Sequence, residues 1–131
     1  EDGMLLENGK VYIAPGDHHM VISSEDGKRY LRLNQDPPEN FCRPAVDPMF
    51  RSLTKEYGSA VLGVILTGMG HDGLAGSKGI VDAGGTIIAQ DEATSVVWGM
   101  PGAVSEAGIC NAVLPLDELG AKVQRLVKGA R

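Results

Sequence analysis

Two short apolar runs, each followed by a sharp turn, constrain the fold of this chain more than any other feature. Residues 61–66 are apolar apart from one glycine, and residues 86–89 form a second, mainly apolar run. Runs without polar alternation are typical of strands covered on both faces in a parallel sheet. We therefore expect residues 61–66 to form a central strand, residues 74–83 a crossover helix, and residues 86–89 the next parallel strand.

The rest of the C-terminal half predicts a further helix, strand and helix. Met100 and Pro101 open a short helix, because proline is favoured in the first helical turn, and residues 112–114 form another short strand. A closing helix then carries apolar residues along one face at helical spacing. These residues are Leu116, Leu119, Val123, Leu126 and Val127.

The N-terminal third has the pattern of short strands separated by turns. Residues 11–14, 19–23 and 30–33 are β-rich runs, and the Asp26-Gly27 pair between the last two predicts a hairpin. Residues 36–40 contain two prolines, which lack amide donors, so this segment is expected to be a loop.

A helix is expected to begin near Val46, where apolar residues start to recur at the spacing of one helical face. Asp47 is predicted as its N-cap and Pro48 as its first helical residue. Gly58 is predicted to end it.

Together these elements predict an α/β fold, a three-layer α/β/α sandwich with a mainly parallel sheet and an antiparallel hairpin. A doubly covered parallel sheet normally has about five or more strands, whereas this sequence supplies about three parallel ones. We therefore expect residues 1–131 to form one partial domain, truncated at its N-terminal side. We also expect the apolar surface left uncovered to drive self-association.

Charge and hydropathy exclude several classes of partner. Twelve Lys and Arg against 17 Asp and Glu give a net charge of −5, and Lys28-Arg29 is the longest basic cluster, so nucleic acid is not an expected partner. No apolar run approaches the roughly 20 residues of a spanning helix, so membrane insertion is not expected. Cys42 and Cys110 lack metal-ligand spacing, which favours a cytoplasmic setting without disulfides or structural zinc.

The glycine-rich turn of residues 67–73 follows the first apolar run, at the sheet edge where open α/β sheets bind their ligands. Its polar side chains are Thr67, His71 and Asp72. A phosphate cradle is disfavoured, because Asp72 would stand in the path of the anion. Two interpretations of Asp72 remain: an N-cap of the following helix, which the pattern favours, or the acid that orients a histidine in a hydrolytic triad.

The residues alone identify no partner for Asp72 in such a triad. His71 is its immediate neighbour, and adjacent side chains diverge, while His18 and His19 have the positions of surface or packing histidines. The sequence contains no Gly-x-Ser-x-Gly nucleophile motif.

A second polar segment, residues 90–95, follows the next strand and reaches the same edge of the sheet. Its carboxylates favour the role of helix caps and dipole partners. Gln90 and Asp91 are expected to line the cleft, with Trp98 and Met100 as part of an apolar wall.

Five blocks of the sequence carry more specific information than the periodicity. They are Tyr-Ile-Ala-Pro-Gly-Asp at residues 12–17 with His19, Arg-Pro-Ala-Val-Asp-Pro-Met-Phe at residues 43–50, and residues 63–73, 89–92 and 99–101. In this order and spacing they resemble the catalytic domain of the chemotaxis protein-glutamate methylesterase (CheB) family. The resemblance extends over nearly the whole chain and is far more specific than one glycine-rich turn.

The resemblance implies a serine hydrolase that removes methyl groups from glutamates on the cytoplasmic helices of chemoreceptors and can also deamidate receptor glutamines. It implies no metal or organic cofactor, and a regulating receiver domain in the full-length protein. The family's nucleophile and histidine lie in blocks that come before the point where this chain begins, so the chain by itself is expected to be inactive. The alternative is a binding or assembly module that keeps the fold without the chemistry.

The resemblance also implies roles for residues of the glycine-rich turn. Asp72 lies in the family's Gly-Met-Gly-x-Asp-Gly motif and corresponds to the triad acid. Met69 corresponds to a cleft residue beside the oxyanion site, and Thr67, Gly68 and Gly70 are expected to shape the same rim.

Overall fold

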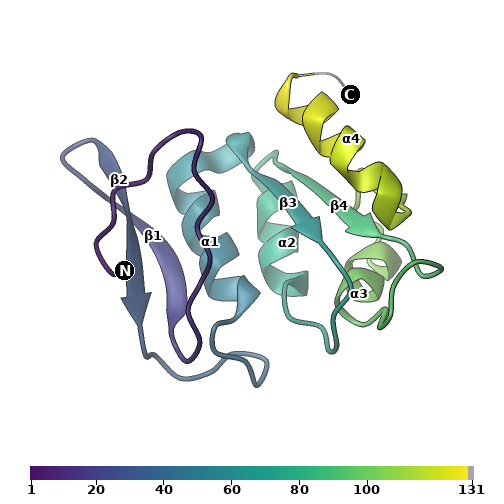
Figure 1. Ribbon diagram of the computed structural model, residues 1–131, viewed down its shortest axis with the longest axis horizontal. Helices are drawn as coiled ribbons and strands as arrows, with labels where there is room; N and C mark the ends of the chain where they lie inside the picture. The colour runs from purple at the N-terminus through teal and green to yellow at the C-terminus, as the bar shows by residue number, and fades with distance from the viewer. Residues whose placement is uncertain (130–131) are drawn as a thin grey trace.

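The computed structural model describes residues 1–129 and contains a β-hairpin, a parallel sheet and four α-helices within them (Figure 1). The observed order of elements agrees closely with the predicted order. The elements are β1 (His19–Glu25), β2 (Lys28–Asn34), α1 (Val46–Tyr57), the 3-10 turn Gly58–Ala60, β3 (Leu62–Ile65), α2 (Leu74–Asp82), β4 (Thr86–Gln90), α3 (Met100–Glu106), β5 (Ala112–Leu114) and α4 (Leu116–Val127).

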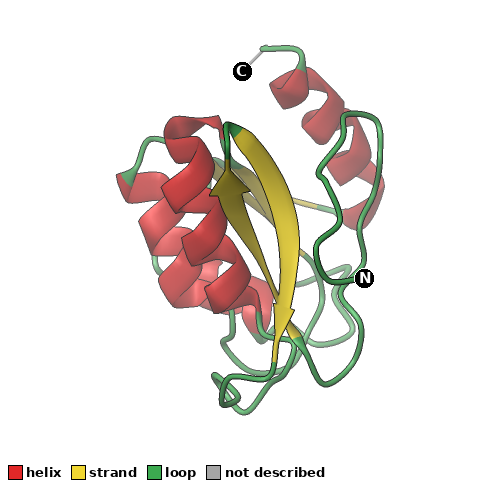
Figure 2. Cartoon of the chain, turned by 90° about the vertical axis from the view of Figure 1, so that its left-hand side faces the viewer, coloured by secondary structure: helices red, strands yellow, loops and turns green. Residues whose placement is uncertain are grey.

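The parallel sheet has the order β3-β4-β5, with Leu62 opposite Thr86 and Ile88 opposite Ala112. The strands lie between α1, α2 and α3 on one side and α4 on the other, which agrees with the predicted three-layer sandwich (Figure 2). Ile87 and Ala89 of β4 point into the core with Phe50, Ile80 and Val104 of the first three helices. One hydrophobic core therefore lies between β4 and this helical layer, and a second one, built on Met20, Ile22 and Leu31, lies between the hairpin and α1.

The prediction that residues 61–66 form a central strand is wrong in one respect. Within residues 1–129 the central strand is β4, where Ile87 and Ile88 are both completely buried. β3 lies at the edge, and its Leu62 and Val64 are only half-buried. The apolar run predicts a strand correctly, but it does not say how many neighbours the strand has.

The N-terminal hairpin confirms the Asp26-Gly27 turn, whose two residues both have a positive φ, of 53° and 77°. The predicted strand at residues 11–14 is absent, and Val11 and Ile13 there are exposed at 90% and 87%. The outer edge of β2 is instead bonded by residues 3–6, through backbone N–H···O contacts of 2.8–2.9 Å. Since those residues take the edge hydrogen bonds of β2, this edge is not available to residues 11–14.

Helix α1 begins at Val46 and is terminated by Gly58 as its C-cap, as predicted, but Asp47 is not its N-cap. The N-cap position belongs to Ala45, which has no side-chain acceptor, and Asp47 lies inside the first turn. The side chain of Asp47 is 4% exposed and accepts a 2.7 Å hydrogen bond from the backbone N–H of Gly76 in α2. Asp47 therefore connects two helices rather than starting one.

Helices α1 and α2 approach each other closely at Gly76. A Cβ atom at this position would lie 2.7 Å from Cβ of Phe50 and 3.0 Å from Oδ1 of Asp47. Gly79, one turn further along α2, has no atom within 4 Å of the same construction. Gly76 is thus packed against α1, whereas Gly79 of the same helix has room for a side chain.

We expect Gly76→Ala to lower the free energy of unfolding by about 1–3 kcal/mol, because the added methyl group overpacks the contact between the helices. Gly79→Ala is the matched control, and it should raise the free energy of unfolding by about 0.5–1 kcal/mol through helix propensity alone. Urea unfolding followed by circular dichroism measures both changes. Equal effects of the two substitutions would contradict the close packing at Gly76.

Candidate functional site

Asp72 lies in the glycine-rich turn between β3 and α2, and its side chain is buried, with 5% exposed. Its Oδ2 accepts a 2.6 Å hydrogen bond from the backbone N–H of Val46, and its Oδ1 accepts one of 3.2 Å from the N–H of Asp47. Both donors belong to the first turn of α1. Asp72 therefore caps the N-terminus of α1 from a distant part of the chain, where the partial positive charge of the helix favours a carboxylate.

The prediction that Asp72 caps the following helix is wrong. The N-cap of α2 is Gly73, which has a φ of 97° and makes no side-chain cap hydrogen bond. The physical reason is that α1 starts after Ala45, which has no oxygen to offer its free N–H groups. The Asp72 carboxylate satisfies those donors, although it lies 26 residues further along the chain from Val46.

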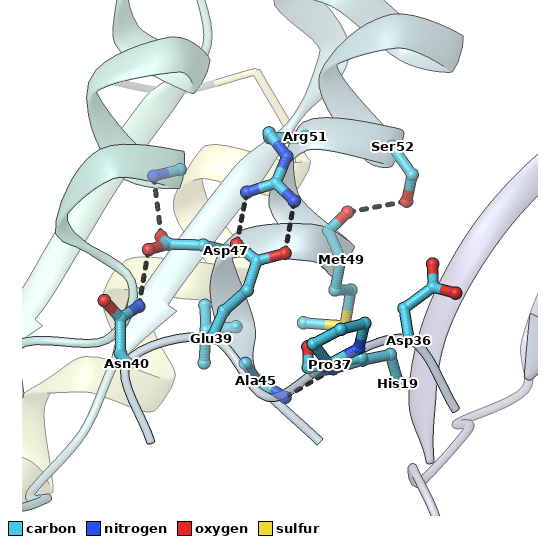
Figure 3. Close-up of polar contacts among 12 residues, drawn as sticks. His19, Asp36, Pro37, Glu39, Asn40, Ala45, Asp47, Met49, Arg51 and Ser52 are labelled. Atoms are coloured by element: carbon cyan, nitrogen blue, oxygen red, sulfur yellow. Dashed lines mark hydrogen bonds and ion pairs between the residues drawn. The ribbon is translucent and has the colours of Figure 1, made fainter. Parts of the chain in front are cut away.

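The side-chain amide of Asn40 joins the carboxylates of Asp47 and Asp72. Its Nδ2 donates to Oδ1 of Asp72 at 2.9 Å and to Oδ2 of Asp47 at 2.8 Å, and Figure 3 shows the second of these contacts. The amide nitrogen carries two hydrogens, and each has a carboxylate acceptor. Asn40 therefore holds two buried acidic side chains together without placing like charges in direct contact.

Asn40 is presented by a tight turn that is fastened to α1. Glu39 and Cys42 exchange backbone hydrogen bonds of 3.1 and 2.9 Å, and the two residues between them, Asn40 and Phe41, have φ values of 52° and 65°. Arg51 of α1 binds both carboxylate oxygens of Glu39, at 2.8 and 2.6 Å (Figure 3). These hydrogen bonds from Arg51 lower the pKa of Glu39, which keeps the pair charged.

One acceptor position of the Asp72 carboxylate stays open among the described residues. A carboxylate oxygen accepts about two hydrogen bonds. Oδ1 already has two donors, from Asn40 and Asp47, whereas Oδ2 has one, from Val46. Oδ2 is therefore the atom of this carboxylate that can accept a further N–H group.

The predicted rim residues are held to the loop that follows β4. The hydroxyl of Thr67 donates to the carbonyl of Val97 at 3.0 Å and accepts from its N–H at 2.9 Å. The carbonyl of Gly68 accepts from the N–H groups of Gly99 and Met100 at 3.1 and 2.8 Å. Met69 follows Gly68 in the chain and precedes Asp72, and it is 82% exposed. The turn therefore has a fixed backbone and an apolar side chain that faces solvent.

Gln90 is buried beneath this rim and holds its backbone, rather than lining a cleft. Its side chain is 1% exposed, so the prediction that it lines the cleft is wrong. Its Oε1 accepts the N–H of Thr67 at 2.8 Å and its Nε2 donates to the carbonyl of Thr94 at 2.8 Å. A buried amide at the end of the central strand thereby ties the two loops together.

The histidines take no part in the Asp72 cluster. His71 is exposed, and His18 bonds only the carbonyl of Gly16 at 3.0 Å within the described residues. His19 is 1% exposed, with Nδ1 accepting the N–H of Ala45 at 3.2 Å and Nε2 lying 3.0 Å from the carbonyl oxygen of Pro37 (Figure 3). The interpretation of His19 as a packing histidine is confirmed.

Sequence reasoning missed Asn40, although one signal was present. Asparagine is among the few residues other than glycine that tolerate a left-handed backbone, and Asn40 follows two prolines in a segment predicted to be a loop. The contact with Asp72 joins residues 32 positions apart, which no local pattern encodes. Within residues 1–129, no cluster of three or more His, Cys, Asp or Glu side chains is arranged to hold a metal ion.

The comparisons with known proteins all lead to one family. The model of the CheB methylesterase family matches residues 1–123. The chain is 60% identical over 126 residues to a protein-glutamate methylesterase/protein-glutamine glutaminase 1 of Paramagnetospirillum magneticum, covering 96% of this chain and 33% of that protein. It is 60% identical over 125 residues to the protein of the same name from Rhodospirillum rubrum, covering 95% of this chain and 32% of that protein.

A solved structure agrees with these relatives. The crystal structure of the Thermotoga maritima CheB methylesterase catalytic domain superposes with a TM-score of 0.93 at 42% identity, covering 96% of this chain and 67% of that chain. The chain thus spans about a third of the curated relatives that it matches. In the part of the chain that the structure describes, no helix has the length and apolar character needed to cross a membrane.

We expect Asp72→Ala to lower the free energy of unfolding by about 1–2 kcal/mol, because the first turn of α1 loses its capping carboxylate. Asp36→Ala is the control, since Asp36 is exposed and its carboxylate makes no hydrogen bond within residues 1–129. The control should change stability by less than about 0.5 kcal/mol. Chemical denaturation compares the variants, and equal stability of Asp72→Ala and the unaltered chain would rule out the capping role.

Proposed function

Because the chain belongs to the CheB methylesterase family, we propose that Asp72 is the acid of a Ser-His-Asp triad that hydrolyses glutamate methyl esters on chemoreceptors. The serine and the histidine come from the segment of the catalytic domain that this chain does not match. The chain alone is then inactive, and its contribution to the site is the acid and the rim around it.

The observation that carries the proposal is the open acceptor position on Oδ2 of Asp72. A triad acid accepts the Nδ1–H of the histidine, and it must be held so that the imidazole keeps one tautomer and one orientation. The other three acceptor positions of Asp72 are used by Val46, Asp47 and Asn40. A carboxylate fixed by three donors, with one position free, has the geometry that this role requires.

The chemistry follows from the triad. The serine oxygen attacks the ester carbonyl while the histidine takes the serine proton, and Asp72 stabilises the imidazolium that forms. The histidine then protonates the leaving methoxide, which departs as methanol. Water, deprotonated by the histidine, attacks the acyl carbonyl, and the bond to the serine oxygen breaks as the histidine returns the proton to it, which releases glutamate. With a glutamine side chain, ammonia leaves in place of methanol, in keeping with the second activity in the names of the relatives.

The glycine-rich turn supplies the rim of this proposed site. Met69, Thr67, Gly68 and Gly70 follow the strand end directly and precede Asp72 by two to five residues. The backbone of this segment is held by Val97 and Met100, and the N–H groups of Thr67 and Gly68 are used by Gln90 and Val97, so the N–H groups that the segment can present at fixed positions are those of Met69 and Gly70. Met69 then lies beside the position where the oxyanion forms.

We expect Asp72→Asn to lower kcat by about 10⁴-fold, because the amide favours the wrong histidine tautomer. The assay measures methanol release from methylated receptor by the chain joined to the serine- and histidine-bearing segment of the family's catalytic domain. Asp36→Asn is the control and should leave the rate unchanged. A rate unaffected by Asp72→Asn would sink the triad assignment.

The same assay separates the alternative of a binding or assembly module. That module would bind methylated receptor without releasing methanol, whichever residue stands at position 72. The proposal also includes a receiver domain as a partner of this catalytic domain in the family's full-length proteins.

The outer edge of β3 supports a second part of the proposal, which is that the isolated chain self-associates. Within residues 1–129 no strand pairs with this edge, and a groove of about 360 Å³ lies between β3, α1 and the hairpin. Its lining is mainly apolar, which makes exposure to water unfavourable. The lining residues are Leu6, Tyr12, Met20, Ile22, Leu31, Met49, Leu53, Tyr57, Ala60, Val61 and Leu62.

We expect the isolated chain to sediment as a dimer or larger species at micromolar concentration, because a second copy covers this edge and groove. Leu62→Lys should shift the chain toward the monomer by placing a charge on the β3 edge. Val113→Lys is the matched control on β5, the opposite edge strand, and should leave the association intact. A well-folded, strictly monomeric chain would contradict the proposal.

A further inference from the structure

We infer that Asn40 is a positioning residue for catalysis: its amide sets the rotation of the Asp72 carboxylate so that Oδ2 faces the histidine. The inference rests on the proposed function, since it concerns how the triad acid is held. Asn40 lies outside the glycine-rich turn and comes from the loop before α1.

The contacts of Asp72 distribute unequally between its two oxygens. Oδ1 is held by Asn40 at 2.9 Å and by the N–H of Asp47 at 3.2 Å, while Oδ2 is held only by the N–H of Val46 at 2.6 Å. Without Asn40, each oxygen would keep a single backbone donor. The carboxylate would then lose the asymmetry that makes Oδ2 the one with space for a further donor.

The orientation of the Asn40 amide follows from its partners. Carboxylates at neutral pH only accept hydrogen bonds, so the atom that contacts both Asp47 and Asp72 must be the nitrogen. Asp47 and Asp72 are 4% and 5% exposed, and two carboxylates this deeply buried repel each other unless a donor lies between them. Asn40 supplies that donor to both.

The amide is itself held from two sides. Its turn is fastened to α1 by the contact of Glu39 with Arg51, at 2.6 and 2.8 Å. On the other side, Asp47 is fixed by the 2.7 Å hydrogen bond from the N–H of Gly76. Through these contacts, α1 and α2 fix where the Asn40 amide lies. A residue that orients the Asp72 carboxylate must itself be fixed in this way.

The function expected of Asn40 is confined to the chemical step. It neither gives nor takes a proton in the reaction, and its amide does not touch the ester. Because the Asp72–histidine contact gains strength as the imidazolium forms, a misdirected carboxylate costs transition-state stabilisation more than substrate binding. We therefore expect an effect on kcat with KM unchanged.

The test compares two substitutions at Asn40 in the chain joined to the serine- and histidine-bearing segment. Asn40→Gly removes the amide while tolerating the φ of 52° at this position, and Asn40→Asp keeps the shape but replaces the donor with a third carboxylate. Asp26→Gly is the matched control, because Asp26 has a φ of 53° in the hairpin turn, away from the site. Kinetics of methanol release and melting temperatures are measured for all variants.

We expect Asn40→Gly to lower kcat about tenfold, with KM and the Asp26→Gly control unchanged. Asn40→Asp should lower kcat further, although it preserves the turn, because it adds a negative charge beside Asp72. In an Asp72→Ala background, Asn40→Gly should cost almost nothing more, since its effect runs through Asp72. A purely structural residue would cost the same in both backgrounds.

The possible failures are distinguishable. Full activity of Asp72→Ala would overturn the proposed function itself. A large loss in Asp72→Ala together with an unchanged kcat in both Asn40 variants would overturn only the inference about Asn40. If Asn40→Gly does not fold, Asn40→Asp decides, and a kcat equal to that of the unaltered protein would then refute the positioning role.

Discussion

The contact of the Asp72 carboxylate with the N-terminus of α1 is the interaction on which the architecture around the candidate site depends. It joins the turn after β3 to the helix that packs between the hairpin and α2. Helix α1 starts after an alanine, so the free N–H groups of its first turn depend on a side chain from elsewhere. One buried acid thus both completes a helix and occupies the position proposed for chemistry.

This double role explains why the sequence predicted the fold better than the site. The hairpin at Asp26-Gly27, the end of α1 at Gly58 and the alternation of strands and helices after residue 61 are encoded in local patterns, and the structure has them. The edge position of β3 and the capping of α1 by Asp72 are settled by contacts across many residues. Periodicity and capping rules describe only neighbours along the chain, so they assigned Asp72 to the nearest helix.

The supports of the site show the same limit. Gln90 and Asn40 are the two amides that hold the loops, and each bonds a partner more than 20 residues away. The resemblance to the methylesterase family located Asp72 through its motif, but it carried no information about what holds the carboxylate. The structure shows what holds it: two backbone N–H groups of α1 and the amide nitrogen of Asn40. The same amide nitrogen also bonds the carboxylate of Asp47.

Gly76 has a consequence that reaches beyond helix packing. Its missing side chain allows α1 and α2 to approach, and its N–H holds the Asp47 carboxylate that in turn holds Asn40. The spacing of α1 and α2 at Gly76 therefore influences the orientation of the Asp72 carboxylate, through the hydrogen bonds of Asp47 and Asn40. A substitution that widens this spacing would therefore weaken the contact between the helices and, in the same step, turn the carboxylate proposed as the triad acid.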